Sequence, residues 1–223
     1  MSDYSWPDRP SETAFPVAKP GYPFIFAAAF ATAVFAMLEI VILALFGLVA
    51  TVFIVYFFRD PDRAVPASPT AVVAPADGKV IGIEKVDGGA FSHGECCKLS
   101  IFMSVFNVHV NRIPLDGVVR KIGYHPGKFV AANLDKASSD NERNAVYIET
   151  RNGKALTVVQ IAGLVARRII CKLTEGDTVV KGQRFGMICF GSRVDLYLPP
   201  EFDATVAVGD TVQSGATILG ELS

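Results

Sequence analysis

The strongest constraint on the fold of this chain is an apolar stretch of 37 residues, from Tyr22 to Phe58, in which Glu39 is the one charged residue. Roughly 20 apolar residues are enough to cross the hydrocarbon core of a bilayer, so this stretch is too long for one ordinary span. Two short helices, near Pro23–Met37 and Ile40–Phe57 with Glu39 close to the turn, fit it best. A single tilted helix with an interfacial lead-in is the alternative. Either arrangement predicts a membrane anchor.

The anchor divides the chain into three parts. Residues 1–21 contain four prolines and mixed charges, which are typical of a loose tail. Residues 22–58 form the anchor, with one or two spans, and residues 59–223 form the remaining domain. A cleaved signal peptide does not fit, because the apolar run begins late, is too long and lacks a basic start with a small-residue cleavage site.

The net charge and the cysteines indicate which partners to expect and on which side of the membrane the domain lies. The formal net charge is −1, so no overall field favours nucleic acid, and none is expected as a partner. The four cysteines have neither zinc-site spacing nor the density of a disulfide framework, and are Cys96, Cys97, Cys171 and Cys189. Reduced thiols indicate that the domain lies on the cytoplasmic side of the cell (inner) membrane. The Lys and Arg residues around the anchor do not settle its orientation.

From Ala71 onward the patterns are those of β-strands joined by turns, with little helical periodicity beyond a short helix near Leu164–Arg167. Gly176-Asp-Thr-Val-Val-Lys-Gly182 recurs as Gly209-Asp-Thr-Val-Gln-Ser-Gly215, a turn sequence typical of flattened β-barrels such as lipoyl and biotinyl carriers. Lys181 lies within this motif and not at a hairpin tip, which disfavours a carrier. The fold class is therefore mainly β (β-rich α+β), a flattened barrel or sandwich hybrid after a helical anchor. Residues 72–84 are predicted to form a strand, an Asp-Gly turn and a second strand, and the other strand candidates are Lys98–Phe106, Gly117–Tyr124, Ala145–Thr150, Ala155–Ile161, Arg168–Leu173 and Val194–Leu198.

The Gly191-Ser192 pair, between two β-like runs, carries the most specific chemistry. Glycine offers an unhindered carbonyl and unusual backbone geometry, so the hydroxyl of Ser192 could attack the bond that precedes it. A serine nucleophile needs a base, and the base benefits from a carboxylate. His109, in a strand-like apolar segment, and Asp77, in an Asp-Gly turn, could supply them if the fold brings them to Ser192.

Six segments in order resemble phosphatidylserine decarboxylases of the short bacterial and archaeal type. The similarity runs from about Phe57 to the C-terminus. The segments are Phe58-Arg-Asp-Pro-Asp-Arg63, Pro75-Ala-Asp-Gly-Lys79, Met103-Ser-Val-Phe-Asn-Val-His-Val-Asn-Arg112, Tyr124-His-Pro-Gly-Lys128, Asp140-Asn-Glu-Arg-Asn144 and Phe190-Gly-Ser-Arg-Val-Asp195.

This resemblance implies a proenzyme that cuts itself between Gly191 and Ser192. Ser192 then becomes a pyruvoyl group at the start of an α chain, residues 192–223, which stays with the β chain, residues 1–191, as a heterodimer; further dimerisation is left open. His109 is implied as the base and Asp77 as the residue that orients it. The pyruvoyl group would form a Schiff base with phosphatidylserine in the membrane and release CO₂ and phosphatidylethanolamine, with no metal.

The resemblance also implies substrate contacts. His125, Lys128, Arg112 and Arg143 are candidates to meet the lipid phosphate or the serine carboxylate. In long-type relatives another histidine stands where this chain has Phe106, and Asn107 stands where many short-type relatives have Asp.

Three other interpretations remain open. An enzyme acting on another phosphoserine lipid, such as archaetidylserine, would share every feature. A membrane-tethered β-barrel adaptor would need a long helical hairpin between residues 80 and 180. An anchored serine hydrolase would keep Ser192 in an uncut chain.

Overall fold

The computed structural model describes residues 16–127, 141–150, 152–163, 168–189 and 191–222. The chain forms two compact units, a helical unit that ends at Asp62 and a β domain that begins at Arg63. The sequence predicted this boundary four residues earlier, at residue 59. The short helix expected near Leu164–Arg167 lies outside the described residues.

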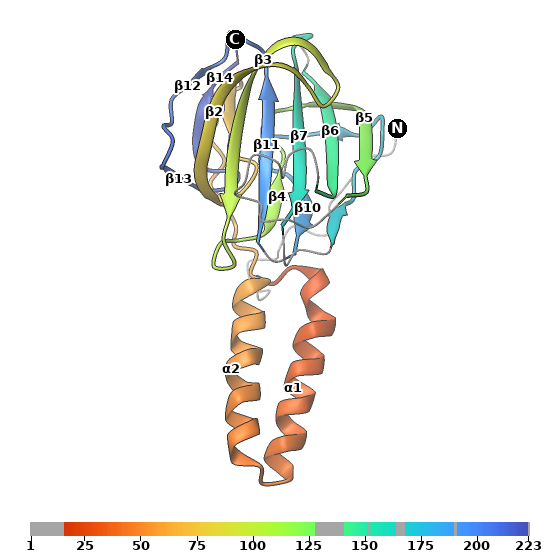
Figure 1. The fold of residues 1–223 in the computed structure, drawn as a ribbon, viewed down its shortest axis with the longest axis vertical. Helices are drawn as coiled ribbons and strands as arrows, with labels where there is room; N and C mark the ends of the chain where they lie inside the picture. Colours follow the sequence, from red (N-terminus) through yellow and green to blue (C-terminus); the bar gives the residue numbers. More distant parts are fainter. Residues whose placement is uncertain (1–15, 128–140, 151, 164–167, 190, 223) are drawn as a thin grey trace. The chain divides into compact units, whose positions relative to one another are not determined.

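The helical unit contains two antiparallel helices that lie side by side (Figure 1). Glu39 occupies the turn between them, with a φ of +59°. The helices pack closely at Gly47, where a Cβ atom would lie 2.6 Å from Thr32 Oγ1. The unit consists of η1 (Lys19–Gly21), α1 (Tyr22–Met37) and α2 (Val41–Phe57).

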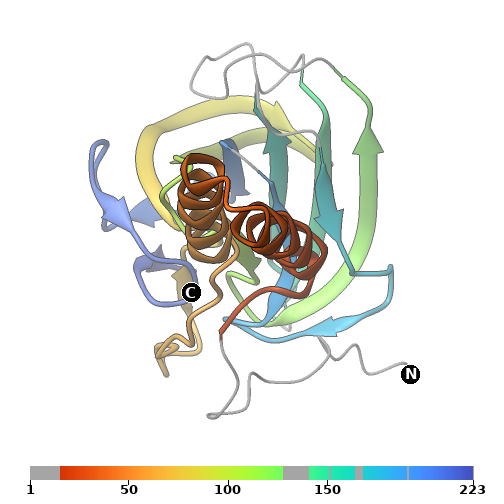
Figure 2. The same ribbon diagram turned by 90° about the horizontal axis from the view of Figure 1, so that it is seen from below.

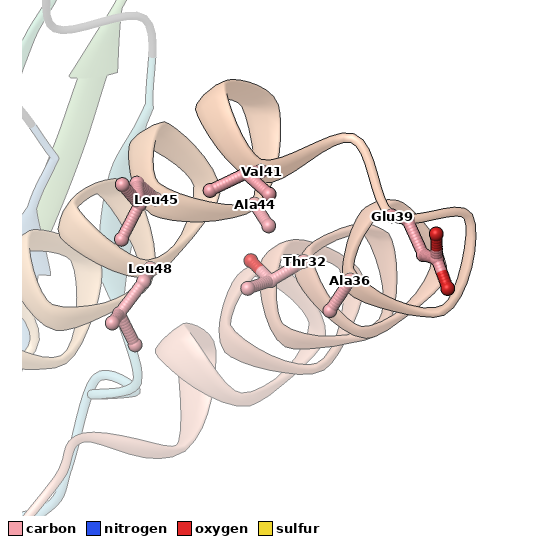
Figure 3. Close-up of a pocket in the computed structure, with 7 residues that line it drawn as sticks. All are labelled: Thr32, Ala36, Glu39, Val41, Ala44, Leu45 and Leu48. Carbon is pink, nitrogen blue, oxygen red and sulfur yellow. The ribbon is translucent and has the colours of Figure 1, made fainter.

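The surface of this unit is apolar. Helix α1 has no buried residue, and most of the large apolar side chains of both helices are exposed. Close to the turn the helices leave an open groove of about 330 Å³, lined mainly by small and aliphatic side chains and bordered by Glu39 (Figure 3). The helical segment Lys19–Met37 is long and apolar enough to cross a membrane, whereas α2 is shorter. This surface is consistent with membrane association, and the number of spans stays a prediction.

The β domain is built on an eight-stranded antiparallel sheet that curls into a half-barrel, in the order β13-β2-β3-β11-β7-β6-β5-β9 (Figures 1 and 2). Two three-stranded sheets, β1-β14-β12 and β4-β10-β8, accompany it. The mainly β fold predicted from the sequence is confirmed. The strands are β1 (Ala71–Val73), β2 (Gly78–Gly89), β3 (Ser92–Met103), β4 (Val110–Arg112), β5 (Gly117–His125), β6 (Arg143–Glu149), β7 (Ala155–Ala162), β8 (Ile169–Cys171), β9 (Thr178–Val179), β10 (Arg184–Ile188), β11 (Ser192–Leu198), β12 (Asp203–Ala204), β13 (Thr211–Val212) and β14 (Ile218–Glu221).

The two faces of the large sheet are covered differently. Alternate side chains of β3 and β11, including Leu99 and Leu196, enter one large core cluster together with Phe185. On the opposite face a small cluster around Val159 and Ile161 packs against Phe91, from the turn between β2 and β3. Both faces of the central strands are therefore buried, which explains the nearly continuous burial of β7 and β11.

The β domain is built from two similar halves. Matching β4–β10, in order, with β1, β2, β3, β11, β12, β13 and β14 reproduces the strand order of every sheet. The Gly-Asp-Thr-Val repeat lies at equivalent places: Gly209 N donates to Val80 O at 2.8 Å, and Gly176 N donates to Val119 O at 2.7 Å. We call β1–β3 with β11–β14 the first half, and β4–β10 the second half. The chain crosses between them twice, between Met103 and Val110 and between Ile188 and Ser192.

The first crossing differs from the sequence prediction. The strand expected over Lys98–Phe106 ends at Met103, and His109 lies outside any strand, directly before β4. The side chain of Asn107 explains this, because its Oδ1 accepts hydrogen bonds from Ser104 N at 2.9 Å and Ser104 Oγ at 2.7 Å. Such an Asn-centred turn competes with strand pairing.

The segment between residues 80 and 180 bears on the adaptor interpretation. Its described residues, which leave out 128–140, 151 and 164–167, contain strands and no helix. The helical hairpin that an adaptor requires is therefore not found in this part of the chain.

Candidate active site

Ser192 is the first residue of β11, in the middle of the large sheet. It pairs with Met103 at the end of β3 and with Ala162 at the end of β7. The residue is fully buried, and its Oγ lies 3.3 Å from Met103 Sδ. A thioether sulfur is a weak acceptor, so this contact restrains the hydroxyl only lightly. The two neighbouring strands fix the backbone of Ser192 from both sides.

Gly191 precedes it in a left-handed conformation, with a φ of +60°. Apart from the glycine and its chain neighbours, no heavy atom of the described residues lies within 4 Å of the position that a Cβ would take. The backbone conformation, and not crowding, therefore favours glycine here, because side-chain-bearing residues adopt this region at a cost of about 1 kcal/mol or more. Gly191 itself places no side chain beside the carbonyl that it shares with Ser192.

His109 lies at the other crossing and is fully buried. Its Nδ1 is 2.9 Å from the carbonyl oxygen of Asn107. A carbonyl oxygen can only accept, so Nδ1 carries the proton, and Nε2 of the neutral ring has the lone pair of a base. The backbone of His109 extends the pairing of β4 with β10, since Ile188 N donates to His109 O at 3.3 Å. Ile188 is three residues before Gly191, so the fold brings both crossings together.

Asp77 ends the turn between β1 and β2 and is buried. Its Oδ2 lies 2.8 Å from Arg63 Nη2, and its Oδ1 accepts a hydrogen bond from Ser214 N at 2.8 Å. Ser214 Oγ lies 3.3 Å from Pro75 O and 3.4 Å from Val110 O. Ser214 thus joins the turn of Asp77 to the residue that follows His109.

Three buried amide side chains form a series of hydrogen bonds that begins next to Met103, the partner of Ser192. Asn111 Nδ2 lies 3.9 Å from Met103 Sδ, and Asn111 Oδ1 accepts from Gln160 Nε2 at 2.9 Å. Gln160 Oε1 in turn accepts from Asn144 Nδ2 at 3.1 Å. Buried amides that bond to one another in this way hold a fixed geometry.

The segment that contains Asn141 and Glu142 forms hydrogen bonds with the end of β7, next to Ser192. Asn141 Nδ2 donates to Ala162 O at 2.7 Å, and Ala162 N donates to Glu142 O at 2.9 Å. Because Ala162 is the partner of Ser192 in β7, this segment positions the start of β11 indirectly.

The candidate substrate residues fall in different places. His125 is exposed at the end of β5, directly opposite the half-buried Arg143 of β6. Arg112 is buried, and its Nη1 donates to Gly182 O at 3.1 Å. Lys128 lies outside the described residues. The structure therefore brings His125 and Arg143 together, while Arg112 contacts one of the repeat turns.

The sequence interpretation gave no role to Arg63, Ser214, Asn111 or Gln160. Arg63 stood within a segment of the family resemblance, and Ser214 within the second Gly-Asp-Thr-Val repeat, so both had a signal. Asn111 also stood within such a segment, and only Gln160 had no signal, because a single polar residue in a strand has no distinctive pattern.

The thiol of Cys189, two residues before Gly191, is a possible competitor to Ser192. It is buried, and burial raises the pKa of its thiol, an effect that Arg168 partly opposes. At neutral pH the group stays protonated and is a poor nucleophile. Among the described residues no group of three His, Cys, Asp or Glu side chains could hold a metal ion.

Comparison with known proteins identifies the class. The family model described as "Phosphatidylserine decarboxylase" matches residues 50–220. "Phosphatidylserine decarboxylase proenzyme" of Desulfotalea psychrophila is 53% identical over 207 residues, covering 93% of this chain and 97% of that protein. Proteins of the same name from Syntrophus aciditrophicus and Burkholderia lata are 50% and 47% identical over 206 and 213 residues, each covering 92% of this chain and 96% of the relative.

The chain is therefore a decarboxylase of a kind made as a proenzyme. It belongs to the phosphatidylserine decarboxylase family. The resemblance found in its sequence is confirmed.

Proposed function

We propose that this chain decarboxylates phosphatidylserine to phosphatidylethanolamine after cutting itself between Gly191 and Ser192, with a pyruvoyl group derived from Ser192. The observation that carries the proposal is the position of the Gly191–Ser192 bond at one crossing between the halves, next to the crossing that contains His109. Family membership supports the reaction class.

Self-cleavage needs only groups of the chain and one water. His109 Nε2 takes the proton of the Ser192 hydroxyl, whose Oγ adds to the carbonyl carbon of Gly191. The Gly191–Ser192 C–N bond breaks and leaves an ester on Oγ. Removal of the α proton of Ser192 then breaks the Cβ–Oγ bond, so that the upstream chain ends in the carboxylate of Gly191. The dehydroalanine that results takes up a proton at Cβ to give an imine, and water then replaces the imine nitrogen, which leaves as ammonia.

The surroundings of Ser192 fit a group that is fixed in place. Residue 192 would stay between Met103 and Ala162, its partners in the sheet. When formed, a pyruvoyl group supplies the carbonyl that captures an amine and the electron sink for loss of CO₂. His109 would hold a proton close to residue 192.

The α chain would stay bound after cleavage. Residues 192–223 contain β11–β14, and β11 pairs with β3 on one side and β7 on the other. Strands β13 and β14 pair with β2 and β1 of the β chain. The cut chains are therefore interleaved in every sheet of the first half, which supports a heterodimer.

The substrate is a lipid, and the apolar helical unit supports its access. An anchored enzyme meets phosphatidylserine within the membrane, with the β domain on the cytoplasmic side. His125 and Arg143, opposite each other at the ends of β5 and β6, are candidates for the acidic headgroup, and Lys128 and Arg112 remain candidates from the sequence.

The mass of the purified, denatured protein tests the proposal. We expect two chains divided after Gly191, with the smaller one lighter than the seryl peptide by one ammonia. Ser192→Ala should give a single uncut chain of 23.9 kDa without decarboxylase activity. Reduction with cyanoborohydride in the presence of phosphatidylserine should add the lipid to the small chain alone. A normal small chain from Ser192→Ala, or an active uncut wild type, would contradict the mechanism.

His109 and the lipid backbone need separate tests. His109→Ala should slow cutting strongly, and efficient cutting by this variant would remove the histidine from the proposed set. Parallel assays with an ester-linked phosphatidylserine and an ether-linked archaetidylserine distinguish the two lipid substrates.

A further inference from the structure

Arg63 contacts the site from a segment that has no place in the mechanism above. It is the first residue of the β domain and follows the end of α2 by six residues. Its Nη2 lies 2.8 Å from Asp77 Oδ2, and its Nη1 lies 3.2 Å from Gln213 Oε1. The guanidinium thus spans the turn of Asp77 and the second Gly-Asp-Thr-Val repeat.

Burial makes this ion pair more significant than an ordinary surface pair. The side chains of Arg63 and Asp77 are only 15% and 10% exposed. A carboxylate in such surroundings needs a positive partner or hydrogen bonds to remain charged, and removal of its partner is costly. Arg63 is therefore placed to compensate the charge of the Asp77 carboxylate and to hold it in one orientation.

The second half of the β domain provides an internal control. Pro114-Leu-Asp-Gly117 occupies the place that Pro75-Ala-Asp-Gly78 has in the first half. Asp116 Oδ1 accepts from Lys181 N at 2.6 Å, just as Asp77 Oδ1 accepts from Ser214 N. Asp116 is exposed, and no basic side chain of the described residues forms an ion pair with it.

The turn itself therefore needs the aspartate but not an arginine. The fold repeats the hydrogen bond between the carboxylate and the backbone in both halves and adds a guanidinium in one. That half contains Asp77, the aspartate predicted from the sequence to orient His109.

We infer that Arg63 is a positioning residue for self-cleavage, acting through Asp77, so that the segment directly after the helical unit completes the candidate active site. This inference rests on the proposed function. A lysine cannot replace Arg63 fully, because a single ammonium cannot reproduce the two-pronged contact with Asp77 and Gln213.

The test follows self-cleavage of the full-length chain, made by cell-free translation in the presence of phosphatidylcholine vesicles and sampled over time on denaturing gels. Arg63→Ala should cut roughly 10- to 100-fold more slowly, a part of what general-base catalysis contributes. Arg63→Lys should fall between Arg63→Ala and the wild type. Arg120→Ala, which removes an arginine from an exposed ion pair with Glu149, is the matched control and should cut normally.

Chemical rescue separates positioning from a merely structural role. Methylguanidinium at millimolar concentration should accelerate Arg63→Ala, and it should not accelerate the double variant Arg63→Ala/Asp77→Asn. Cutting of Arg63→Ala at the wild-type rate, absence of rescue, or equal acceleration of the double variant would each overturn the inference.

A second variant and the wild type itself cover the cases in which Arg63→Ala gives no result. If Arg63→Ala does not fold, Gln213→Ala, which removes only the second contact of the guanidinium, should slow cutting a few-fold, and unchanged cutting by both this variant and Arg63→Lys would overturn the inference. Failure of the wild type to cut would instead refute the proposed function.

Discussion

The two halves of the β domain have nearly the same strand arrangement and different chemistry. Each half contains a Pro-x-Asp-Gly turn whose aspartate accepts a backbone hydrogen bond from a Gly-Asp-Thr-Val repeat. In the first half this aspartate, Asp77, is buried and paired with Arg63; in the second half Asp116 is exposed. The repeated contacts belong to the fold, and the contacts that differ identify the candidate site.

The two crossings between the halves carry the remaining chemistry. His109 lies directly before β4, where the chain enters the second half, and Ser192 begins β11, where the chain has left it. Cleavage at this crossing would separate β11–β14 from β1–β3 along the chain, but the pairing of β11 with β3 and β7, and of β13 and β14 with β2 and β1, would hold the two chains together. A duplicated barrel can therefore lose this peptide bond and remain assembled.

The largest expected contrast comes from making the same substitution in both halves. Asp77→Asn and Asp116→Asn each keep an oxygen that accepts the backbone hydrogen bond and remove only the charge. We expect Asp77→Asn to slow self-cleavage roughly 100-fold or more, comparable to loss of the carboxylate from a hydrolase triad, and Asp116→Asn to cut normally. Equal rates in the two variants, measured by the time course of cutting, would remove the distinction between the halves.

Glycines of the repeats should behave alike in both halves. Gly182 and Gly215 have φ values of +78° and +74°, and a Cβ would lie 2.3 Å from Val65 Cγ2 or 2.8 Å from Arg112 Cδ. Gly182→Ala and Gly215→Ala should each lower the free energy of unfolding by about 2 kcal/mol, from backbone strain and steric overlap.

This prediction needs a chain that stays in one piece and a control without overlap. Denaturant unfolding in the uncut Ser192→Ala background meets the first need. Gly153→Ala meets the second, because Gly153 has a φ of +75° and nothing within 4 Å of its Cβ position. The free energy of unfolding of Gly153→Ala should be lower by about 1 kcal/mol. A loss confined to one half would show that the repeats differ in structure as well as in chemistry.

The central strands of the two halves differ as well. Strand β11 contains the buried pair Arg193–Asp195, with Arg193 Nε 2.5 Å from Asp195 Oδ1, whereas β7 contains no charged residue. Burial, and next the charge of Asp195, raise the pKa of the neighbouring Tyr197 to about 12. The ordinary value is about 10, so the unfolded chain loses this proton first as the pH rises.

The stability contributed by protonated Tyr197 should be fully present below pH 10 and lost as the pH approaches 12. Over this interval the free energy of unfolding of the wild type should fall by on the order of 2 kcal/mol more than that of Tyr197→Phe. Both are measured by unfolding in the uncut background. Tyr124→Phe is the comparison variant: desolvation, and next Glu142, raise the pKa of this exposed tyrosine, so its removal should take away a smaller part of the pH dependence than Tyr197→Phe does. The same slope in Tyr197→Phe as in the wild type would exclude Tyr197 as its source.

The sequence predicted the parts of this molecule that depend on local pattern. The helix pair followed from one charge in 37 residues, and the flattened barrel from turns such as Gly209-Asp-Thr-Val. His109 was expected in a strand-like segment and lies between a turn and β4. The turn forms because Asn107 Oδ1 accepts hydrogen bonds from Ser104, a contact that hydrophobic periodicity does not register.

The residue types of the candidate site could be predicted from the sequence, but the hydrogen bonds and ion pairs that connect them could not. Gly191-Ser192 and the family segments pointed to Ser192, His109 and Asp77, whose predicted roles remain predictions. The bond from Ser214 to Asp77 joins residues 137 positions apart, and the pair Arg63–Asp77 joins two segments through burial. Only the folded pairing of the two halves brings such groups together. The Pro-x-Asp-Gly repeat at Asp77 and Asp116 was present in the sequence and would have indicated the duplication.

The smallest contrast concerns the residues that donate to the two aspartates. Ser214 and Lys181 have equivalent backbone bonds, but only the Ser214 hydroxyl lies between Pro75 O and Val110 O. Loss of one such hydrogen bond is worth about 1 kcal/mol, so Ser214→Ala should slow self-cleavage about five-fold. Lys181→Ala, which keeps its backbone donor, should cut at the wild-type rate. If both variants cut normally, the Ser214 hydroxyl only fills space between the two turns. Any effect of Asp77 on His109 would then depend on contacts other than this hydroxyl.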